Sequence, residues 1–167
     1  KEKENILNQD FTTTSINQKW SADITYIHTE KDGWTYLASV EDLYSRKIIG
    51  WAFGKTMDAE LAKKALKNAS LNVKKTKGII LQTDLGSQYT SNIFEEYLAE
   101  LKIRHSYSRK GCPYDNSCIE SFHSILKKEE VNLKKYNKFK DAYNAIFEFI
   151  EAWYNRERIH SSLNYRT

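Results

Sequence analysis

Three acidic side chains, Asp23, Asp84 and Glu120, fall in three different local settings of the sequence. Asp23 lies in an apolar, strand-like run, Asp84 comes directly after a second such run, and Glu120 lies in a helical stretch with 35 residues between it and Asp84. Magnesium is usually held by one or two carboxylates together with phosphate oxygens. Three acids that converge from separate elements therefore predict a divalent metal site.

Each acid also has a structural alternative. Alternation along the strand places Asp23 on a face with Thr25 and Ile27, where neighbouring backbone or hydroxyl groups would have to satisfy a carboxylate that is costly to bury. Asp84 begins a polar loop, which would instead be a turn that leads into the next helix. Glu120 would complete a capping box with Ser117. The residues alone leave both interpretations open at all three positions.

Basic and polar groups surround the third acid. Glu120, His123 and Lys127 recur at i, i+3 and i+7, so they form a polar stripe along one side of the predicted helix. The stripe is either a functional surface or a solvated helix face. Arg109 and Lys110, on the kinked loop before this helix, would either grip phosphates or simply face solvent.

The charge distribution favours a polyanionic partner. The net charge is +4, and the segment Lys102–Thr167 carries 13 Lys and Arg against 8 Asp and Glu. Neutralisation of phosphates supplies much of nucleic-acid affinity. Lys128 belongs to this basic half of the chain. Arg158 and His160 also belong to it, and these two residues would either contact DNA or compensate the C-terminal charge of a helix.

The sequence predicts an α/β fold that brings these residues together. An Asp32-Gly33 pair between two β-rich runs indicates a hairpin, and a third run after Ser45 extends it into an antiparallel meander. Later strands alternate with helices, which implies parallel pairing. We expect a five-stranded mixed sheet flanked by helices, with strands near residues 22–29, 34–40, 47–53, 79–83 and 103–107, and with helices near residues 58–71, 91–101, 117–130 and 139–154.

Composition indicates one packed, soluble domain. The chain has 167 residues, 40% of them hydrophobic and 13% aromatic, and no apolar run approaches the length of a membrane span. We therefore predict a single domain over residues 1–167. Cys112 and Cys118 lack zinc-ligand spacing, so we expect two reduced thiols. Because the chain opens on Lys1 rather than on a methionine, we read it as an excised fragment.

Five blocks of the sequence resemble the catalytic core of insertion-sequence DDE transposases and retroviral integrases. The blocks are NQKWSADITYI, EDLYSRKIIGW, LQTDLGSQYTS, GCPYDNSCIESFHSILKKE and NRERIHSSLNY. They occur in the order that is typical of this family and cover nearly the whole chain. The resemblance implies a ribonuclease H-like fold in which Asp23, Asp84 and Glu120 form the catalytic, metal-binding triad.

The same resemblance implies cofactors, partners and location. The cofactor would be Mg²⁺, with Mn²⁺ as a substitute, and the substrate would be DNA at transposon ends and target sites. Lys127 looks like the family's DNA-contacting basic residue. Self-association on DNA and a place in the bacterial cytoplasm, at the nucleoid, would follow, with no membrane partner.

The chain departs from the family pattern at two points. Gln82 and Leu85 stand where histidine and arginine commonly flank the second aspartate, which weakens the expected local contacts to DNA. The family's upstream helix-turn-helix region is not present either, so we expect recognition of the element's ends to be missing from this fragment. We also expect residues 1–17 to be an extended lead-in. Without metal, the three acids should repel one another and raise at least one pKa.

Two other functions fit these features. A nuclease of the same fold would hydrolyse DNA but never join strands. A catalytically silent DNA-binding or assembly domain would retain salt-sensitive DNA binding after loss of all three acids.

Overall fold

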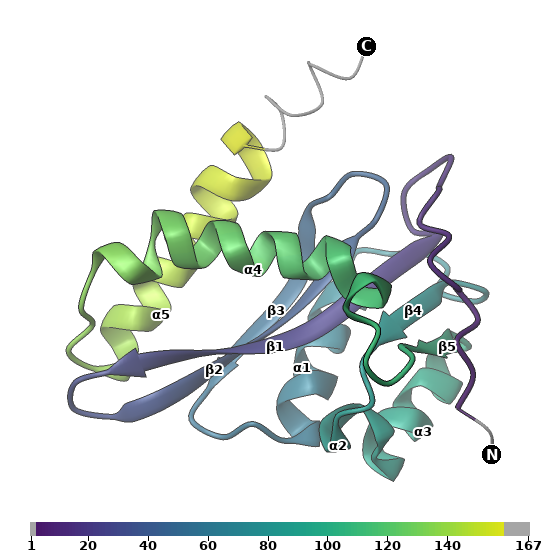
Figure 1. Cartoon of the computed structure of the whole chain (residues 1–167), viewed down its shortest axis with the longest axis horizontal. Helices are drawn as coiled ribbons and strands as arrows, with labels where there is room; N and C mark the ends of the chain where they lie inside the picture. Colours follow the sequence, from purple (N-terminus) through teal and green to yellow (C-terminus); the bar gives the residue numbers. More distant parts are fainter. Residues whose placement is uncertain (1–2, 159–167) are drawn as a thin grey trace.

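The computed structural model describes residues 3–158, in which one five-stranded sheet forms the centre of the molecule (Figure 1). Its spatial order is β3-β2-β1-β4-β5. The first three strands pair antiparallel, whereas β4 and β5 pair parallel to β1 and to each other. The predicted mixed sheet is therefore confirmed. The strands are β1 (Lys19–Thr29), β2 (Gly33–Asp42), β3 (Ile48–Gly54), β4 (Ile80–Thr83) and β5 (Arg104–Tyr107).

Helices cover both faces of this sheet. In Figure 1, α1, α2 and α3 lie on one face, while α4 and α5 lie on the other. The short helix α2 lies in a stretch for which the sequence predicted only a loop. The helices are α1 (Ala59–Ser70), α2 (Ser87–Thr90), α3 (Asn92–Leu101), α4 (Ser117–Glu129) and α5 (Phe139–Phe147), with short 3₁₀ turns η1 (Pro113–Asn116) and η2 (Val131–Leu133) beside α4.

Local sequence signals set several of these boundaries. Asp58 accepts a hydrogen bond from the Leu61 amide at 2.9 Å and caps α1, and Ser91 caps α3 through the Phe94 amide. Both are ordinary N-cap contacts that satisfy an orphan donor. Gly33 begins β2 with φ +72°, the left-handed conformation that glycine adopts at little cost. The predicted hairpin is confirmed.

Two apolar cores lie on opposite faces of the sheet. On one side Trp20, which is fully buried, packs with α1 and α3; on the other, Ile27 packs with α4 and α5. The first core requires close approach, because a Cβ added to Gly50 of β3 would lie 2.3 Å from the main-chain nitrogen of Ala69 in α1. The sheet is thus buried between two helical layers.

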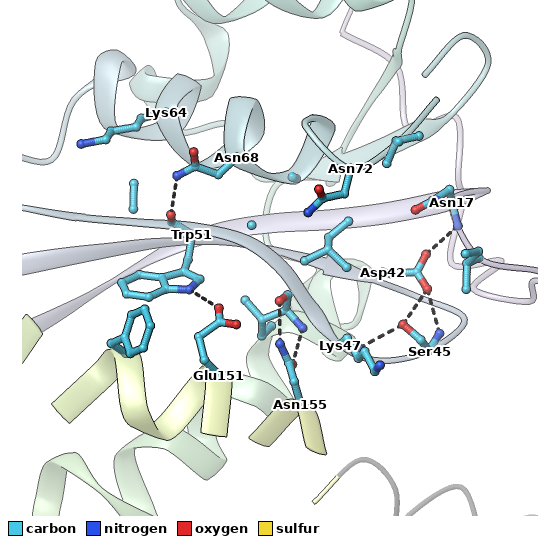
Figure 2. A pocket seen from close by; sticks show the side chains of 18 of the residues that line it. Asn17, Asp42, Ser45, Lys47, Trp51, Lys64, Asn68, Asn72, Glu151 and Asn155 are labelled. Carbon is cyan, nitrogen blue, oxygen red and sulfur yellow. Dashed lines mark hydrogen bonds between the residues drawn. The ribbon is translucent and has the colours of Figure 1, made fainter. Parts of the chain in front are cut away.

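The last described helix changes its winding and protects the edge strand β3. The sequence predicted one long helix, but α5 continues as a π-helix, η3 (Glu148–Arg158), a winding that apolar spacing does not predict. Asn155 accepts from the Ile48 amide and donates to the Ile48 carbonyl, both at 2.9 Å, and Glu151 accepts from Trp51 at 2.8 Å (Figure 2). The Asn155 contacts satisfy main-chain groups of Ile48 on this edge strand, beside a cavity of about 620 Å³.

The loop before α4 is fixed by a buried carboxylate. Asp115, fully buried, accepts hydrogen bonds from the Arg109 amide at 2.7 Å and from the Arg109 guanidinium at 3.0 Å. Asn5 and Gln9 also donate to it, so the segment before β1 packs against this loop. Within residues 3–158, no helix has both the length and the apolar character to cross a bilayer.

Candidate active site

The first two acids lie side by side on neighbouring parallel strands. In the β1–β4 pairing, Ser21 is opposite Gln82. Asp23 and Asp84 each lie two residues further along, so the parallel register places them at the same level of the sheet. Asp23 is in the middle of β1, and Asp84 follows the carboxyl end of β4 directly, where ligands of open α/β sheets commonly bind.

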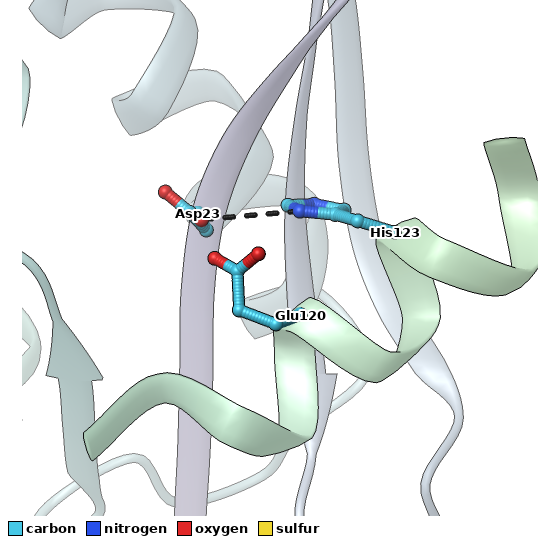
Figure 3. Close-up of side chains that lie close together, drawn as sticks. All are labelled: Asp23, Glu120 and His123. Atoms are coloured by element: carbon cyan, nitrogen blue, oxygen red, sulfur yellow. Dashed lines mark ion pairs between the residues drawn. The ribbon is translucent and has the colours of Figure 1, made fainter. Parts of the chain in front are cut away.

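Helix α4 carries the third acid across β1. Glu120, in its first turn, is exposed, and His123, one turn later, is only 7% exposed. Figure 3 shows both side chains directed from α4 toward Asp23. One ligand atom from each of Asp23, Glu120 and His123 lies within 4.8 Å of the others. The structure therefore joins two predicted ligands with a histidine that was assigned only to a polar stripe.

Burial and neighbouring charge act strongly on Asp23. It is 8% exposed, and its pKa is raised to about 9, first by burial and then by hydrogen bonding to Glu120 and the charges of Asp84 and Glu120. A hydrogen bond from the Ile24 main chain opposes these effects only in part. The expected rise of at least one pKa is found at Asp23, but burial rather than repulsion between the acids is its largest cause. Asp84 is thus close enough to act on Asp23 through its charge.

His123 is neutral and poorly partnered. Burial lowers its pKa to about 4 against the opposing charge of Glu120, and the charge of Lys127 lowers it further. Its Nδ1 lies 3.8 Å from Asp23 Oδ2, beyond hydrogen-bond distance. Its Nε2 is buried with no hydrogen-bond partner. Buried polar atoms of this kind are uncommon and call for an explanation.

Asp84 is oriented by its own loop and lies outside that compact group of three. Its Oδ1 accepts a hydrogen bond from the Gly86 amide at 2.8 Å, so the turn that the sequence offered as an alternative is present as well. A Cβ on Gly86 would lie 2.9 Å from Asp84 Oδ1 and 2.6 Å from Gln88 Nε2. A Cβ here would therefore displace the ends of these two side chains, one of which is the carboxylate of the predicted ligand.

A buried network supports the main chain at the same position. Thr83 Oγ1 lies 2.9 Å from the Asp84 carbonyl oxygen and 2.7 Å from His105 Nε2. The other ring nitrogen of His105 contacts Glu95, which also accepts from the Tyr107 hydroxyl at 2.7 Å. Strand β5 and helix α3 thus hold the end of β4, from which Asp84 projects.

Two alternative interpretations of the α4 residues are wrong. Helix α4 begins after Asn116 and has no side-chain cap bond, so Ser117 and Glu120 form no capping box. The stripe is not a solvated face either, because His123 is buried and Lys127 is half-buried. Tertiary packing turns this side of the helix partly toward β1. The only signal in the sequence was the Glu120-x-x-His123 spacing, which places both side chains on one side of a helix.

The predicted DNA-contacting residues lie in different environments. The Lys127 ammonium donates to the Tyr26 carbonyl and lies 4.8 Å from the centre of the Tyr26 ring, and burial lowers its pKa. Arg109 is engaged with Asp115, whereas Lys110 and Lys128 are exposed. Arg158 is the last residue of η3, and His160 lies outside the described residues.

The donor set suits a hard divalent cation. Asp23 and Glu120 offer carboxylate oxygens, Asp84 lies beside them on the next strand, and a neutral imidazole lies within the same group. The pKa of Asp23 is raised first by burial, then by the hydrogen bond to Glu120 and by the charges of Asp84 and Glu120, and a bound cation would favour the ionised form of this carboxyl group. The residues therefore fit the metal that the sequence predicted.

Comparison with known proteins supports the same conclusion. Two family models described as Integrase core domain match residues 13–113 and 101–167. The chain is 40% identical over 163 residues to the transposase for insertion sequence element IS904 of Lactococcus lactis, which covers 98% of this chain and 64% of that protein. It is 44% identical over 158 residues to transposase InsF for insertion sequence IS3A of Escherichia coli, which covers 95% of this chain and 54% of that protein. The chain thus spans only part of the length of these relatives.

A solved structure shares the fold. The HTLV-2 integrase catalytic core domain in complex with magnesium (trimeric form) has a TM-score of 0.59 and 20% sequence identity, covering 80% of this chain and 84% of that chain. The mixed sheet, its two helical layers and the acids at its centre define a ribonuclease H-like domain. The chain belongs to the integrase core domain family. The resemblance to insertion-sequence transposase cores is confirmed.

Proposed function

We propose that this domain is the catalytic core of a DNA transposase that cuts and joins DNA strands with the help of Mg²⁺, for which Mn²⁺ can substitute. The observation that carries the proposal is the convergence of Glu120 from α4 on Asp23 of β1, with Asp84 beside Asp23 on the next strand. The transposase relatives and the family match support the same assignment.

Each acid has a distinct role in this proposal. Asp23 is the central ligand, because it lies between the other two acids and is influenced by the charge of both. Asp84 holds its carboxylate on the β4 side, where the Gly86 amide orients it. Glu120 completes the site from the exposed side, next to an open cavity of about 510 Å³ that provides room for substrate. When bound, divalent cations supply Lewis-acid stabilisation to the attacking and leaving oxygens of an in-line displacement.

The reaction proceeds by two phosphodiester displacements. In the first, a water oxygen attacks phosphorus at the end of the element, and the bond to the 3′ oxygen breaks to leave a 3′ hydroxyl. In the second, that hydroxyl oxygen attacks a target phosphodiester, forms a new strand junction and expels a target 3′ oxygen, which takes up a proton. Asp23, Asp84 and Glu120 position the reacting groups, and no covalent enzyme intermediate is formed.

Basic side chains beside the site would position the DNA backbone. Lys110 and Lys128 are exposed and available for phosphate contacts. Lys127 would have to exchange its contact with the Tyr26 carbonyl for a phosphate oxygen. Arg109 would act mainly by fixing the loop before α4 through Asp115. Arg158 and His160 complete the proposed DNA-binding set.

The proposed partners are transposon ends, target DNA and further copies of this chain. The HTLV-2 integrase core, whose fold is shared, is described in a trimeric form with magnesium. Assembly of several copies on paired DNA ends would be consistent with that form. The bacterial relatives favour a cytoplasmic location at the nucleoid.

The test is a strand-transfer assay with DNA labelled at its 3′ end, in Mg²⁺ and in Mn²⁺. We expect the wild-type protein to form joined products, and the Asp84→Asn and Glu120→Gln variants to lose them. Wild-type activity in either variant would contradict the assigned roles. Cleavage without joining would identify a plain nuclease, and metal-independent DNA binding without cleavage would identify a silent binding domain.

A further inference from the structure

His123 is the one member of the compact site for which the proposed function assigns no role. It is 7% exposed, it is directed from α4 toward Asp23 (Figure 3), and its Nε2 has no hydrogen-bond partner. Its Nδ1, the ring nitrogen nearer the carboxylate, lies 3.8 Å from Asp23 Oδ2 and makes no hydrogen bond to it. A buried imidazole whose nitrogens both lack protein partners costs stability. The question is what kind of ligand the surrounding atoms would accept.

The distances match those of ligands that share one metal ion. Two ligands bound about 2.1 Å from an ion lie at most about 4.2 Å apart. Asp23 Oδ2 and His123 Nδ1 are 3.8 Å apart, and the ligand atoms of Asp23, Glu120 and His123 all lie within 4.8 Å of one another. Small side-chain rotations would therefore bring all three onto a common ion.

The spacing of the two helical residues points the same way. Glu120 and His123 are three residues apart on α4, and a Glu-x-x-His pair on one helix is used to bind metal in di-iron and di-manganese carboxylate proteins. Asp84 lies outside this group, beside Asp23 on the neighbouring strand.

We infer that His123 supplies a nitrogen ligand to one of two unequal metal positions, formed by Asp23, Glu120 and His123, while Asp23 and Asp84 provide an all-oxygen position. The inference rests on the proposed metal-dependent function. Magnesium strongly favours oxygen ligands, whereas imidazole raises the affinity for first-row transition ions. The first position should therefore select Mn²⁺ over Mg²⁺, and His123 is the specificity-determining residue.

Electron spin-echo spectroscopy of the whole chain with Mn²⁺ alone tests this directly. Bound Mn²⁺ should show modulation from a ¹⁴N nucleus of imidazole, and the Asp23→Asn variant should lose the bound ion. His123→Phe, which keeps a ring of similar shape, should abolish the nitrogen signal and weaken Mn²⁺ binding by about tenfold or more. Its Mg²⁺ affinity should change by less than about threefold.

Matched controls separate the outcomes. His28→Gln removes an exposed histidine of β1 and should leave the nitrogen signal intact. Mn²⁺ that binds without nitrogen modulation, or modulation that persists in His123→Phe, would overturn the inference. The wild-type spectrum alone shows whether bound Mn²⁺ has a nitrogen ligand, so this outcome does not depend on how well the variant folds. Nitrogen ligation in a protein that joins no DNA strands would instead overturn the proposed function and leave this inference in place.

Discussion

Within residues 3–158, two histidine side chains are buried beside carboxylates, and they differ in how well their ring nitrogens are hydrogen-bonded. The His105 side chain is 7% exposed, and both of its ring nitrogens have partners, in Glu95 and Thr83. The His123 side chain is 9% exposed, but its Nδ1 is 3.8 Å from Asp23 and its Nε2 has no partner. The two side chains are therefore buried to a similar extent, but only His105 has partners at both ring nitrogens.

From this difference we interpret His105 as a structural residue and His123 as a residue available to a ligand. The network around His105 is closed, so its low dielectric surroundings strengthen each hydrogen bond and fix the end of β4. The group around His123 is incomplete, because Nε2 has no partner and Nδ1 is beyond hydrogen-bond distance of Asp23, whose pKa is raised mainly by burial. An incomplete site of this kind lowers the stability of the free protein and can bind a ligand. The following predictions test this contrast.

The largest effect on strand transfer should come from neutralising Asp23, compared with neutralising Glu95 beside the other histidine. Asp23→Asn should reduce strand transfer by at least about a hundredfold, because metal ligands provide several kcal/mol of transition-state stabilisation. Glu95→Gln, the matched control beside His105, should keep activity within about tenfold and lower the melting temperature. Labelled-DNA assays and thermal melts of both variants measure this, and equal losses of activity would remove the contrast.

Replacing each histidine by phenylalanine should affect stability in opposite ways. His105→Phe removes the contact to the buried Thr83 and the contact to Glu95, whose side chain is 33% exposed and keeps its bond from Tyr107. It should cost about 2–4 kcal/mol in the free energy of unfolding. His123→Phe removes an unsatisfied group and should be neutral or stabilising in the absence of metal. Urea unfolding without divalent ions provides the values, and a larger loss for His123→Phe would contradict the comparison.

The open site should also make stability depend on pH. The pKa of Asp23 is about 9 in the folded protein against 3.8 when unperturbed, so folding retains a proton that the unfolded chain releases. Stability should therefore fall as pH rises from about 4 to about 9. His123, with a lowered pKa of about 4, loses stability only below about pH 6.5.

Between about pH 7 and about pH 9, Asp23 should dominate this dependence. The metal-free wild type should lose about 1–2 kcal/mol over that range, whereas Asp23→Asn should lose much less. Saturating Mg²⁺ should flatten the wild-type curve, because a bound cation favours the ionised carboxylate. Parallel slopes for wild type and Asp23→Asn in metal-free melts would rule out the assigned pKa.

The smallest effect should come from the turn that orients Asp84. Gly86→Ala would place a Cβ 2.9 Å from Asp84 Oδ1, so the carboxylate must move. We expect strand transfer to fall by roughly threefold to tenfold, since small displacements of positioning groups reduce rates. The melting temperature should change little, because the φ of Gly86 is −59°, which alanine also adopts. An unchanged rate would show that the position of Asp84 is not critical.

Much of the fold followed from local patterns. The alternation along β1 correctly placed Asp23 on the face of Ile27, which packs against α4. The predicted starts of two helices near residues 58 and 91 coincide with the caps Asp58 and Ser91, and Asp32-Gly33 was correctly identified as a hairpin turn. These features depend on neighbours in the chain or on one repeating period, so short-range physical rules describe them.

The remainder depended on contacts between distant residues. The buried position of His123 follows from how α4 is rotated on β1, which its own periodicity does not determine. The pairing of Asp115 with Asn5 spans 110 positions, and no local pattern indicates it. The π-helical winding of η3, with Asn155 against Ile48, likewise follows from packing on β3. The sequence therefore predicted the fold that brings Asp23 and Glu120 together, but not the burial of His123 beside them.

Anomalous X-ray diffraction from crystals soaked in Mn²⁺ tests the central claim most directly. We predict a peak within ligand distance of Asp23 and Glu120, with a second peak between Asp23 and Asp84 at higher metal occupancy. Soaked crystals with no peak at these carboxylates, or with Mn²⁺ bound only elsewhere on the surface, would contradict the account.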